Sequence, residues 1–263
     1  MPRRLLLLCV LVGCAARSSG GGSAVPDPRL DEVDRRWDMR GQDGFEPVAD
    51  LLQGPEGSVE SVDPEWLWRR VRLEVGRGLE SEGDRRVAMQ HYASARALGL
   101  RCLDGAPAFR QQRGERGLAD AARVLPPTRV GCAAWTALAW ARWAALFGGE
   151  AAAMDLPGIE ALAAYSVSNS SGSIRSTGAW AEAIAVACQP DWVAEDPERA
   201  TRLMQRAVEL APEQLMRQWD LVWLVAAPLG YADLESTTLE KLLESSPRTP
   251  ADRTAFGMAS LKE

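Results

Sequence analysis

Residues 75–95 read VGRGLESEGDRRVAMQHYASA, and this stretch decides the fold. Glu82-Gly83-Asp84 interrupts a helical pattern, so the stretch predicts two consecutive helices. In the second helix Ala88, Tyr92 and Ala95 recur at i, i+4 and i+7, which places them on one face. Alanine lets two helix backbones approach closely, and the tyrosine ring fills the gap between neighbouring pairs. The stretch therefore predicts a packed helical hairpin.

The first helix of this hairpin begins at Asp63-Pro64-Glu65, because aspartate is a favoured N-cap and proline suits the first helical position. We expect it to end near Glu80, and the second helix to run from about Arg85 to Leu98 and end at Gly99. The sequence of 263 residues contains only three isoleucines and three tyrosines, whereas alanine and leucine are abundant. Residues that favour strands are scarce, so the predicted fold class is all-α.

The spacing Val75-Gly76-x-x-Leu79, followed by the alanine and tyrosine stripe, resembles a tetratricopeptide (TPR) repeat. Arg72 stands where such repeats usually have tryptophan. Asp196-Pro197-Glu198-Arg199-Ala200-x-x-x-Met204-x-x-Ala207 has the same order of small and large apolar residues, and Trp135-x-x-Leu138-Ala139 is a third partial match. The resemblance implies a degenerate array of TPR-like helical hairpins, an α-solenoid, over residues 63–263.

The rest of this domain is also expected to be helical, with two interruptions. Residues 101–117, which contain several Gly and Pro, and the polar residues 166–176 are expected to be loops. Residues 24–60 lack sustained periodicity and are expected to be mainly a linker, with short helices near 30–37 and 48–52. The further expected helices are 128–147, one that begins near 156, 177–188, 215–226, 239–243 and 251–261.

The charged and titratable residues exclude several classes of function. A net charge of −6 makes a nucleic-acid partner unlikely on physical grounds, because phosphate binding needs clustered Lys and Arg. His91 is the only histidine, which excludes multi-histidine metal sites; we expect it to be exposed and non-catalytic. The carboxylate pairs Glu80/Glu82 and Glu195/Asp196 fall at helix ends, where turns and caps explain them. No cofactor or metal motif is found, and the protein is not expected to be an enzyme.

The first fourteen residues predict a secreted lipoprotein. Arg3 and Arg4 precede a short apolar run, which is typical of a signal peptide over residues 1–13. Leu11-Val12-Gly13-Cys14 resembles the bacterial lipoprotein box, in which the cysteine is acylated and becomes the first residue; the alternative is an ordinary signal with a chance cysteine. Ala15 follows in place of the aspartate that retains lipoproteins in the inner membrane, which favours the outer membrane, facing the periplasm. Residues 14–62 are then the tether and approach segment.

The remaining cysteines leave two alternatives open. Three cysteines, an odd number, remain as candidates for pairing: Cys102, Cys132 and Cys188. In the first alternative they form one disulfide and one buried thiol, as an oxidising compartment would allow. In the second, which agrees equally well with the sequence, all three are unpaired and serve as small apolar core residues.

Tryptophan is unusually frequent, with ten residues against four phenylalanines. Ligand pockets are enriched in aromatic and aliphatic surface, so some of these side chains are candidates for the wall of an apolar cavity. The alternative is that they only fill the core between helices. The candidate cavity residues are Trp135, Leu138, Trp143, Trp180, Trp219 and Trp223.

The order of these features resembles the T-component lipoproteins of tripartite ATP-independent periplasmic (TRAP) transporters. The features are the lipobox, a repeat pair, the Trp/Ala-rich helix around 133–140, Asp155-Leu156-Pro157-Gly158-Ile159, and the Asp-Pro-Glu-Arg-Ala helix at 196–200. The resemblance implies a membrane-anchored helical protein that pairs with a periplasmic solute-binding protein and holds or passes a hydrophobic ligand. The alternatives are a general TPR scaffold for envelope protein assembly, without a small ligand, and an envelope hydrolase built on a helical solenoid.

Overall fold

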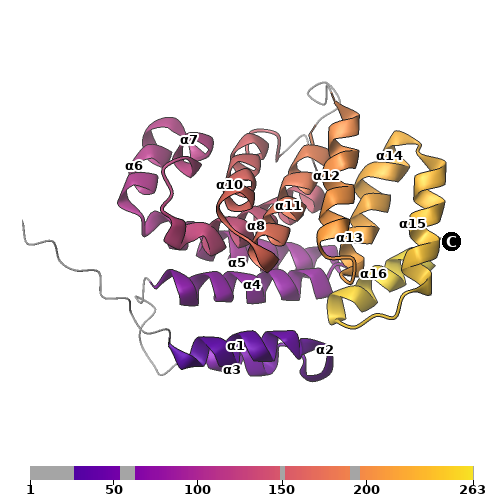
Figure 1. Cartoon of the computed structure of the whole chain (residues 1–263), viewed down its shortest axis with the longest axis horizontal. Helices are drawn as coiled ribbons and strands as arrows, with labels where there is room; N and C mark the ends of the chain where they lie inside the picture. Colours follow the sequence, from indigo (N-terminus) through magenta and orange to yellow (C-terminus); the bar gives the residue numbers. More distant parts are fainter. Residues whose placement is uncertain (1–26, 54–62, 149–151, 190–195, 263) are drawn as a thin grey trace, which may run out of the picture.

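The computed structural model describes residues 27–53, 63–148, 152–189 and 196–262. All regular secondary structure in these ranges is helical, and the helices form an elongated array (Figure 1). No helix among the residues described has the length and apolar character needed to cross a bilayer. The all-α prediction is confirmed.

The helices follow one another with short connections. The N-terminal layer consists of α1 (Pro28–Asp38), α2 (Arg40–Asp43) and α3 (Glu46–Gln53). The body contains α4 (Pro64–Glu80), α5 (Arg85–Asp104), α6 (Pro107–Arg116), α7 (Leu118–Ala122), the 3₁₀ turn Pro127–Arg129, α8 (Val130–Phe147), α10 (Leu156–Asn169), α11 (Gly172–Ala187), α12 (Pro197–Leu210), α13 (Leu215–Asp220), a π-helical segment (Leu221–Ala226), α14 (Ala227–Leu229), α15 (Ala232–Glu244) and α16 (Pro250–Ser260).

The hairpin predicted from residues 75–95 is formed by α4 and α5. Asp63 caps α4 by accepting a hydrogen bond from the backbone N–H of Glu65, and Asp84 caps α5 in the same way. Ala88, Tyr92 and Ala95 are all fully buried. A Cβ at Gly78 would come within 2.5 Å of the Tyr92 ring, so the two helices touch at this glycine. The glycine of the predicted spacing, Gly76, instead lies against Phe45 and Trp37 of the N-terminal segment.

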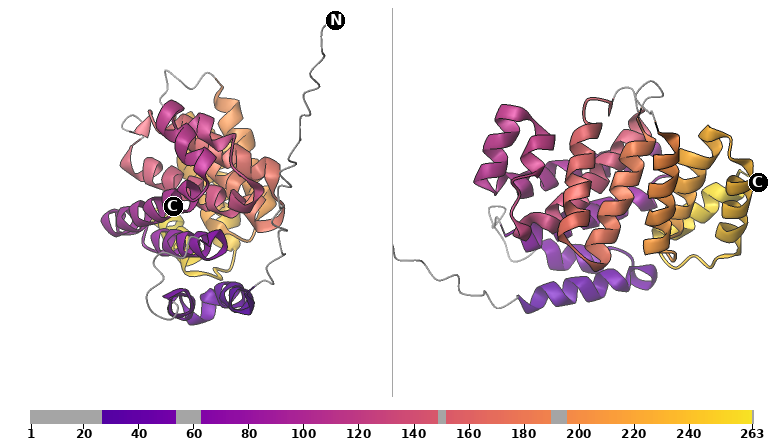
Figure 2. Two further views of the ribbon diagram at one scale, coloured as in Figure 1. Left: turned by 90° about the vertical axis from the view of Figure 1, so that its left-hand side faces the viewer. Right: turned by 45° about the horizontal axis from the view of Figure 1, so that its top comes forward.

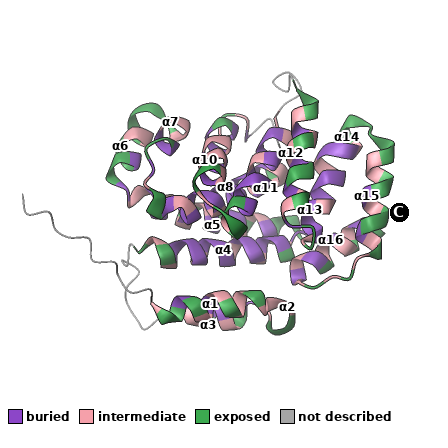
Figure 3. Cartoon of the chain, in the orientation of Figure 1, coloured by how far each residue is buried: buried purple, intermediate pink, exposed green. Residues whose placement is uncertain are grey.

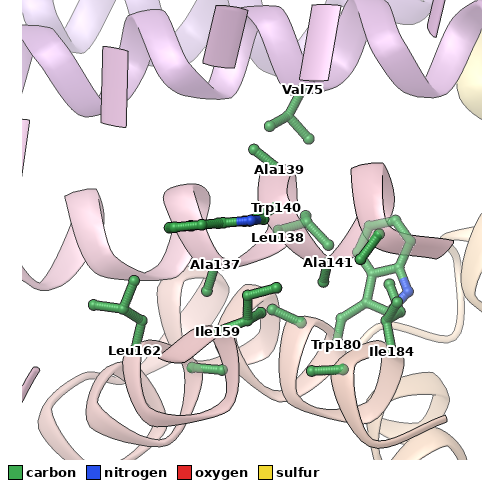
Figure 4. Close-up of a cluster of buried hydrophobic side chains, with 14 of the residues drawn as sticks. Val75, Ala137, Leu138, Ala139, Trp140, Ala141, Ile159, Leu162, Trp180 and Ile184 are labelled. Atoms are coloured by element: carbon green, nitrogen blue, oxygen red, sulfur yellow. The ribbon is translucent and has the colours of Figure 1, made fainter. Parts of the chain in front are cut away.

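Helix α8 is the centre of the body and contacts α4, α5, α10 and α11. Most of its residues are buried, and all but a few of them are apolar, which suits a helix surrounded by others (Figure 3). In Figure 4, Val75 of α4 lies on one side of α8, while Ile159 and Leu162 of α10 and Trp180 of α11 lie on the other. The alanines of α8, such as Ala137 and Ala141, let these neighbours approach closely.

A disulfide joins α5 to α8. Cys102 and Cys132 are bonded, with Cα atoms 6.0 Å apart. Cys188 is a free thiol, and burial raises its pKa to about 12, so it stays protonated and unreactive. Of the two alternatives for the cysteines, one disulfide with one buried thiol is the one formed.

The C-terminal helix returns to the start of the body. Helix α16 packs against α4 and α13 (Figure 1). The Thr254 hydroxyl donates a hydrogen bond of 2.8 Å to the backbone carbonyl of Glu80. Thr249 and Asp252 form a reciprocal capping box at the beginning of α16. The last helix therefore closes one end of the array against the first hairpin.

Residues 28–53 form a helical layer rather than the expected linker. The layer lies along α4, on the side away from α10 and α12 (Figure 2). The two short helices expected near 30–37 and 48–52 are present, and both are amphipathic. Each is too short to give a long periodic pattern, but together they bury a cluster against Leu73 of α4. Its other members are Val33, Phe45, Val48, Ala49 and Leu52.

Two segments expected as loops are also mainly helical. Helix α5 continues through Gly99 to Asp104, and Pro107 takes the first position of α6 instead of interrupting the chain. Between α10 and α11 the connection is reduced to Ser170 and Ser171. Gly99 was expected to end a helix; its role is a close contact, because a Cβ there would meet the Thr136 side chain of α8 at 2.0 Å.

We predict that Gly99→Ala destabilises the protein, because the new methyl group overlaps Thr136. The net cost should be about 1–3 kcal/mol in urea unfolding, even though alanine is the better helix former. Gly114→Ala is the matched control: it is a helical, exposed glycine with no neighbouring atoms within 4 Å, so we expect a gain of up to about 1 kcal/mol. Equal effects of the two substitutions would contradict the close contact between α5 and α8.

Candidate ligand cavity

A cavity of about 420 Å³ lies between the N-terminal layer and the body. Its walls come from α1 and α2, the middle of α4, the first half of α8, and the N-terminal ends of α11, α13 and α16 (Figure 1). A Cβ at Gly41 of α2 would come within 2.0 Å of the Arg248 carbonyl, so the layer touches the segment before α16 at the cavity edge. The volume falls in the range typical of small-molecule sites.

One wall of the cavity is aromatic. Trp37 of α1 lies 5.7 Å from Phe45 and 6.0 Å from Trp135 of α8, measured between ring centroids, with the Trp135 contact edge-on. Trp68 of α4 and Trp180 of α11 complete this wall. The indole N–H of Trp135 is buried and has no hydrogen-bond partner. A buried donor without a partner is rare in proteins, which makes this atom a candidate contact for a ligand.

Arg72 of α4 reaches the cavity between two tryptophans. Its guanidinium lies 4.6 Å from the Trp37 ring centroid and 5.0 Å from that of Trp68. One terminal nitrogen donates to Asp34 at 2.6 Å, but the Nε atom is buried without a partner. Burial lowers the pKa of Arg72 to about 10, so the side chain remains charged at neutral pH in an environment that disfavours the charge.

Arg217 of α13 is almost completely buried at the other side of the cavity. Its Nη1 atom donates to the Ser176 carbonyl and hydroxyl and to the Ala207 carbonyl, and its Nε donates to Gln214. The guanidinium lies 5.0 Å from the Trp180 ring centroid. Burial lowers its pKa to about 10. All of these protein partners are neutral groups.

Two further arginines belong to the cavity. Arg40 donates to the Trp37 carbonyl at 2.7 Å and lies 4.3 Å from the Trp37 ring centroid, and burial lowers its pKa. Arg248 is exposed at the cavity edge. The lining thus combines aromatic rings with several guanidinium groups, which is more polar than the apolar cavity expected from the sequence.

The acidic residues at the cavity do not form ion pairs with these four arginines, apart from the Asp34 contact with Arg72. Asp252 is buried, and its carboxylate accepts hydrogen bonds from the backbone N–H groups of Leu215 and Thr249, both at 2.9 Å. Asp38 and Glu213 are exposed. Among the described residues, no group of three or more His, Cys, Asp or Glu side chains is placed to hold a metal ion.

The structure brings only two of the six expected cavity residues to this site. Trp135 and Trp180 line it. Leu138 and Trp219 are buried in the core, and Trp223 packs against the core from the π-helical segment. Trp143 lies elsewhere: it stacks on Phe147 at 4.5 Å and lines a shallow apolar groove beside α5.

Sequence reasoning missed the arginines and Trp37. Trp37 and Arg40 lie in the segment expected as a linker, and Arg72 was noted only as a departure from the repeat pattern. One signal was available: Arg72 and Arg217 stand among apolar residues of their helices, at positions that the helical period turns inward. A charged residue on a buried helix face is a candidate for function.

Behind the cavity wall lies a buried network of charged groups. Arg142 of α8 forms ion pairs with Glu82, in the turn between α4 and α5, and with Asp220 at the end of α13. All three side chains are 0–2% exposed. Tyr92 donates to Glu82, and the Trp180 indole N–H donates to Asp220 at 2.6 Å. The expectation that Glu82 serves only a helix end is therefore wrong, because it neutralises a buried arginine.

The network fixes one wall of the cavity. The Trp180 edge is held by Asp220 while its face lies beside Arg217, so the ring orientation is defined from both sides. His91 has no part in this site. It is only partly exposed, and its Nδ1 atom lies 2.9 Å from a Glu74 carboxylate oxygen on the α4–α5 hairpin.

The chain matches no family model, and no curated protein matches it. The assignment of a function therefore rests on the geometry of the cavity and on the sequence motifs.

We predict that Asp220→Asn changes how stability depends on pH. Burial raises the pKa of Asp220 to about 6, from 3.8, so the folded state binds this proton more tightly than the unfolded state does. The contribution of Asp220 to the unfolding free energy of the wild type is therefore favourable below pH 4 and is lost as the pH rises through 6. The unfolding free energy of Asp220→Asn, relative to wild type, should rise by up to about 3 kcal/mol between pH 4 and 7.

Chemical denaturation of both proteins at several pH values measures this difference. The matched control is Asp120→Asn, because Asp120 lies on the surface beside Arg123 and has no part in the network. A difference between wild type and Asp220→Asn that stays constant with pH would show that the carboxyl is ionised throughout this range.

Proposed function

We propose that this chain is a lipid-anchored periplasmic binding component of a TRAP-type transport system. In this proposal the TPR-like helical array docks a solute-binding protein, and the cavity holds a small ligand. The observation that carries the binding function is the cavity itself, which is lined by tryptophan rings and by two buried donors without protein partners, Arg72 Nε and the Trp135 indole N–H. A scaffold without a ligand gives no reason for such a site.

The sequence motifs and the disulfide support the location. The Cys14 lipidation site, the signal peptide and the Ser/Gly-rich part of the tether lie in residues 1–26, outside the described residues. The Cys102–Cys132 bond is stable in an oxidising compartment such as the periplasm. The proposed location is the periplasmic face of the outer membrane, with the acyl chains on Cys14 as the anchor.

The proposal contains no catalytic step. Glu82 and Asp220 are the buried carboxylates closest to the pattern of an acid–base pair, but both are held by Arg142 and neither lines the cavity. The residues that do line it donate hydrogen bonds and offer aromatic faces, which suits binding and orientation of a ligand.

Affinity capture from native membranes tests the transport proposal. With the intact chain as bait and a membrane-permeable crosslinker, we expect a stoichiometric periplasmic solute-binding protein, identified by mass spectrometry. The control bait is an unrelated periplasmic domain fused to residues 1–26 of this chain. Recovery of secretion or outer-membrane assembly proteins instead would contradict the transport proposal and favour a scaffold.

The anchor is tested separately with Cys14→Ser. Removing the thiol leaves no site for acylation, so we expect the protein to lose metabolic labelling with palmitate and to leave the outer-membrane fraction. Cys9→Ser is the matched control, because Cys9 lies inside the proposed signal peptide and should not affect either property. Unchanged labelling of Cys14→Ser would exclude the lipoprotein assignment.

A further inference from the structure

Three of the arginines at the cavity make no direct ion pair with any residue that the structure describes. In the part of the chain that the structure describes, Arg40, Arg217 and Arg248 have no carboxylate oxygen within 4.0 Å. Arg72 shares Asp34 with Arg69, so one carboxylate serves two guanidinium groups. The lining also contains Asp38, Glu213 and Asp252, so these arginines are set apart by the lack of direct ion pairs and not by an excess of positive charge.

Burying these groups costs free energy that the acidic residues near them offset only in part. Arg217 is 1% exposed and Arg72 is 7% exposed, and burial lowers the pKa of both. The positive charge of Arg40 further disfavours the charged form of Arg72. The tryptophan faces offset part of this cost through cation–π contacts, but they carry no negative charge.

From this arrangement we propose that the cavity binds a small aromatic anion. The anionic group lies among Arg40, Arg217 and Arg248, and the ring of the ligand packs against Trp37 and Trp135. Guanidinium groups suit such a ligand because they pair with carboxylate and related oxyanions through two parallel hydrogen bonds. This inference names the ligand of the proposed binding function and rests on that function.

The atoms that lack partners agree with this orientation. The Nη2 atom of Arg217 makes no hydrogen bond, since its bonds come from Nε and Nη1. The Nε and Nη2 atoms of Arg40 also make no hydrogen bond, because the one hydrogen bond of this side chain comes from Nη1. Together with the indole N–H of Trp135, these are all donors, so a ligand that accepts hydrogen bonds satisfies them.

A cation or a neutral acceptor fits less well. Of the acids at the cavity, Asp252 is occupied by backbone N–H groups, and Asp38 and Glu213 are exposed. The one buried carboxylate in the described lining, Asp252, is thus already held by backbone donors and is poorly placed to receive a cation. A neutral ligand would satisfy the donors but would leave the guanidinium charges without compensation.

Isothermal titration calorimetry on the full-length protein in nanodiscs tests this inference. The probes share one ring system: 2-naphthoate and 2-naphthalenesulfonate are anionic, 2-naphthalenemethanol is neutral, and 2-naphthylmethylamine is cationic. We expect both anions, or the carboxylate alone, to bind at least tenfold more tightly than the neutral and cationic probes. Binding of the anions should also weaken as salt is added.

Single substitutions locate the anion. Arg40→Gln and Arg248→Gln should each weaken binding of 2-naphthoate about tenfold and leave 2-naphthalenemethanol unchanged. Arg248 is exposed, so its substitution does not threaten folding, whereas Arg217→Gln removes several structural hydrogen bonds and is not used. Arg123→Gln is the matched control: Arg123 is 79% exposed and is not among the residues that line the cavity, so binding should not change.

Three results would overturn the inference: equal or tighter binding of the neutral probe, failure of both anions to bind at millimolar concentration, or anion binding unaffected by Arg40→Gln and Arg248→Gln. The proposed transport function is judged by the captured partner. Capture of a solute-binding protein together with preferred binding of the neutral probe would reject the anion and keep the function.

Discussion

The ion pairs of Arg142 with Glu82 and Asp220 are the constraint on which the rest of the structure depends. Arg142 projects from the central helix α8, Glu82 lies in the turn of the first hairpin, and Asp220 ends α13. The helices around α8 meet largely through alanine and glycine, which allow many relative positions. A buried charge without its partner is strongly unfavourable, so the three elements are held where all of these groups are paired.

The cavity follows from this arrangement. Asp220 also accepts the indole hydrogen of Trp180, so the network that joins the helices sets the orientation of a ring in the cavity wall. Elsewhere in the lining, the Trp37 ring centroid lies 4.3 Å from the guanidinium group of Arg40 and 4.6 Å from that of Arg72. These polar contacts restrain both rings from turning into the cavity. The cavity is therefore built by rigid side chains, and the guanidinium groups both support its walls and face its interior.

The N-terminal layer makes the site a property of the whole chain. Trp37 and Arg40 come from α1 and α2, which directly follow the proposed tether, whereas Arg217 and Arg248 come from the C-terminal helices. Close contacts join these parts: Gly76 of α4 lies against Phe45 and Trp37, and Gly41 lies against the Arg248 carbonyl. The described segment nearest in sequence to the proposed lipidation site thus forms one wall of the cavity.

The sequence by itself determined the helices, because the signals for them act locally along the chain. These signals are caps such as Asp63 and Asp84, the stripe of Ala88, Tyr92 and Ala95, and the scarcity of residues that favour strands. The sequence did not determine the site. Of the six residues expected to line a cavity, only Trp135 and Trp180 line the one between the N-terminal layer and the body. Periodicity shows that a side chain faces inward. It does not separate the core from a cavity wall, because both contain inward-facing aromatic side chains. Only the tertiary structure decided which arginines meet, because Arg40, Arg72, Arg217 and Arg248 are brought together by packing between helices distant in sequence.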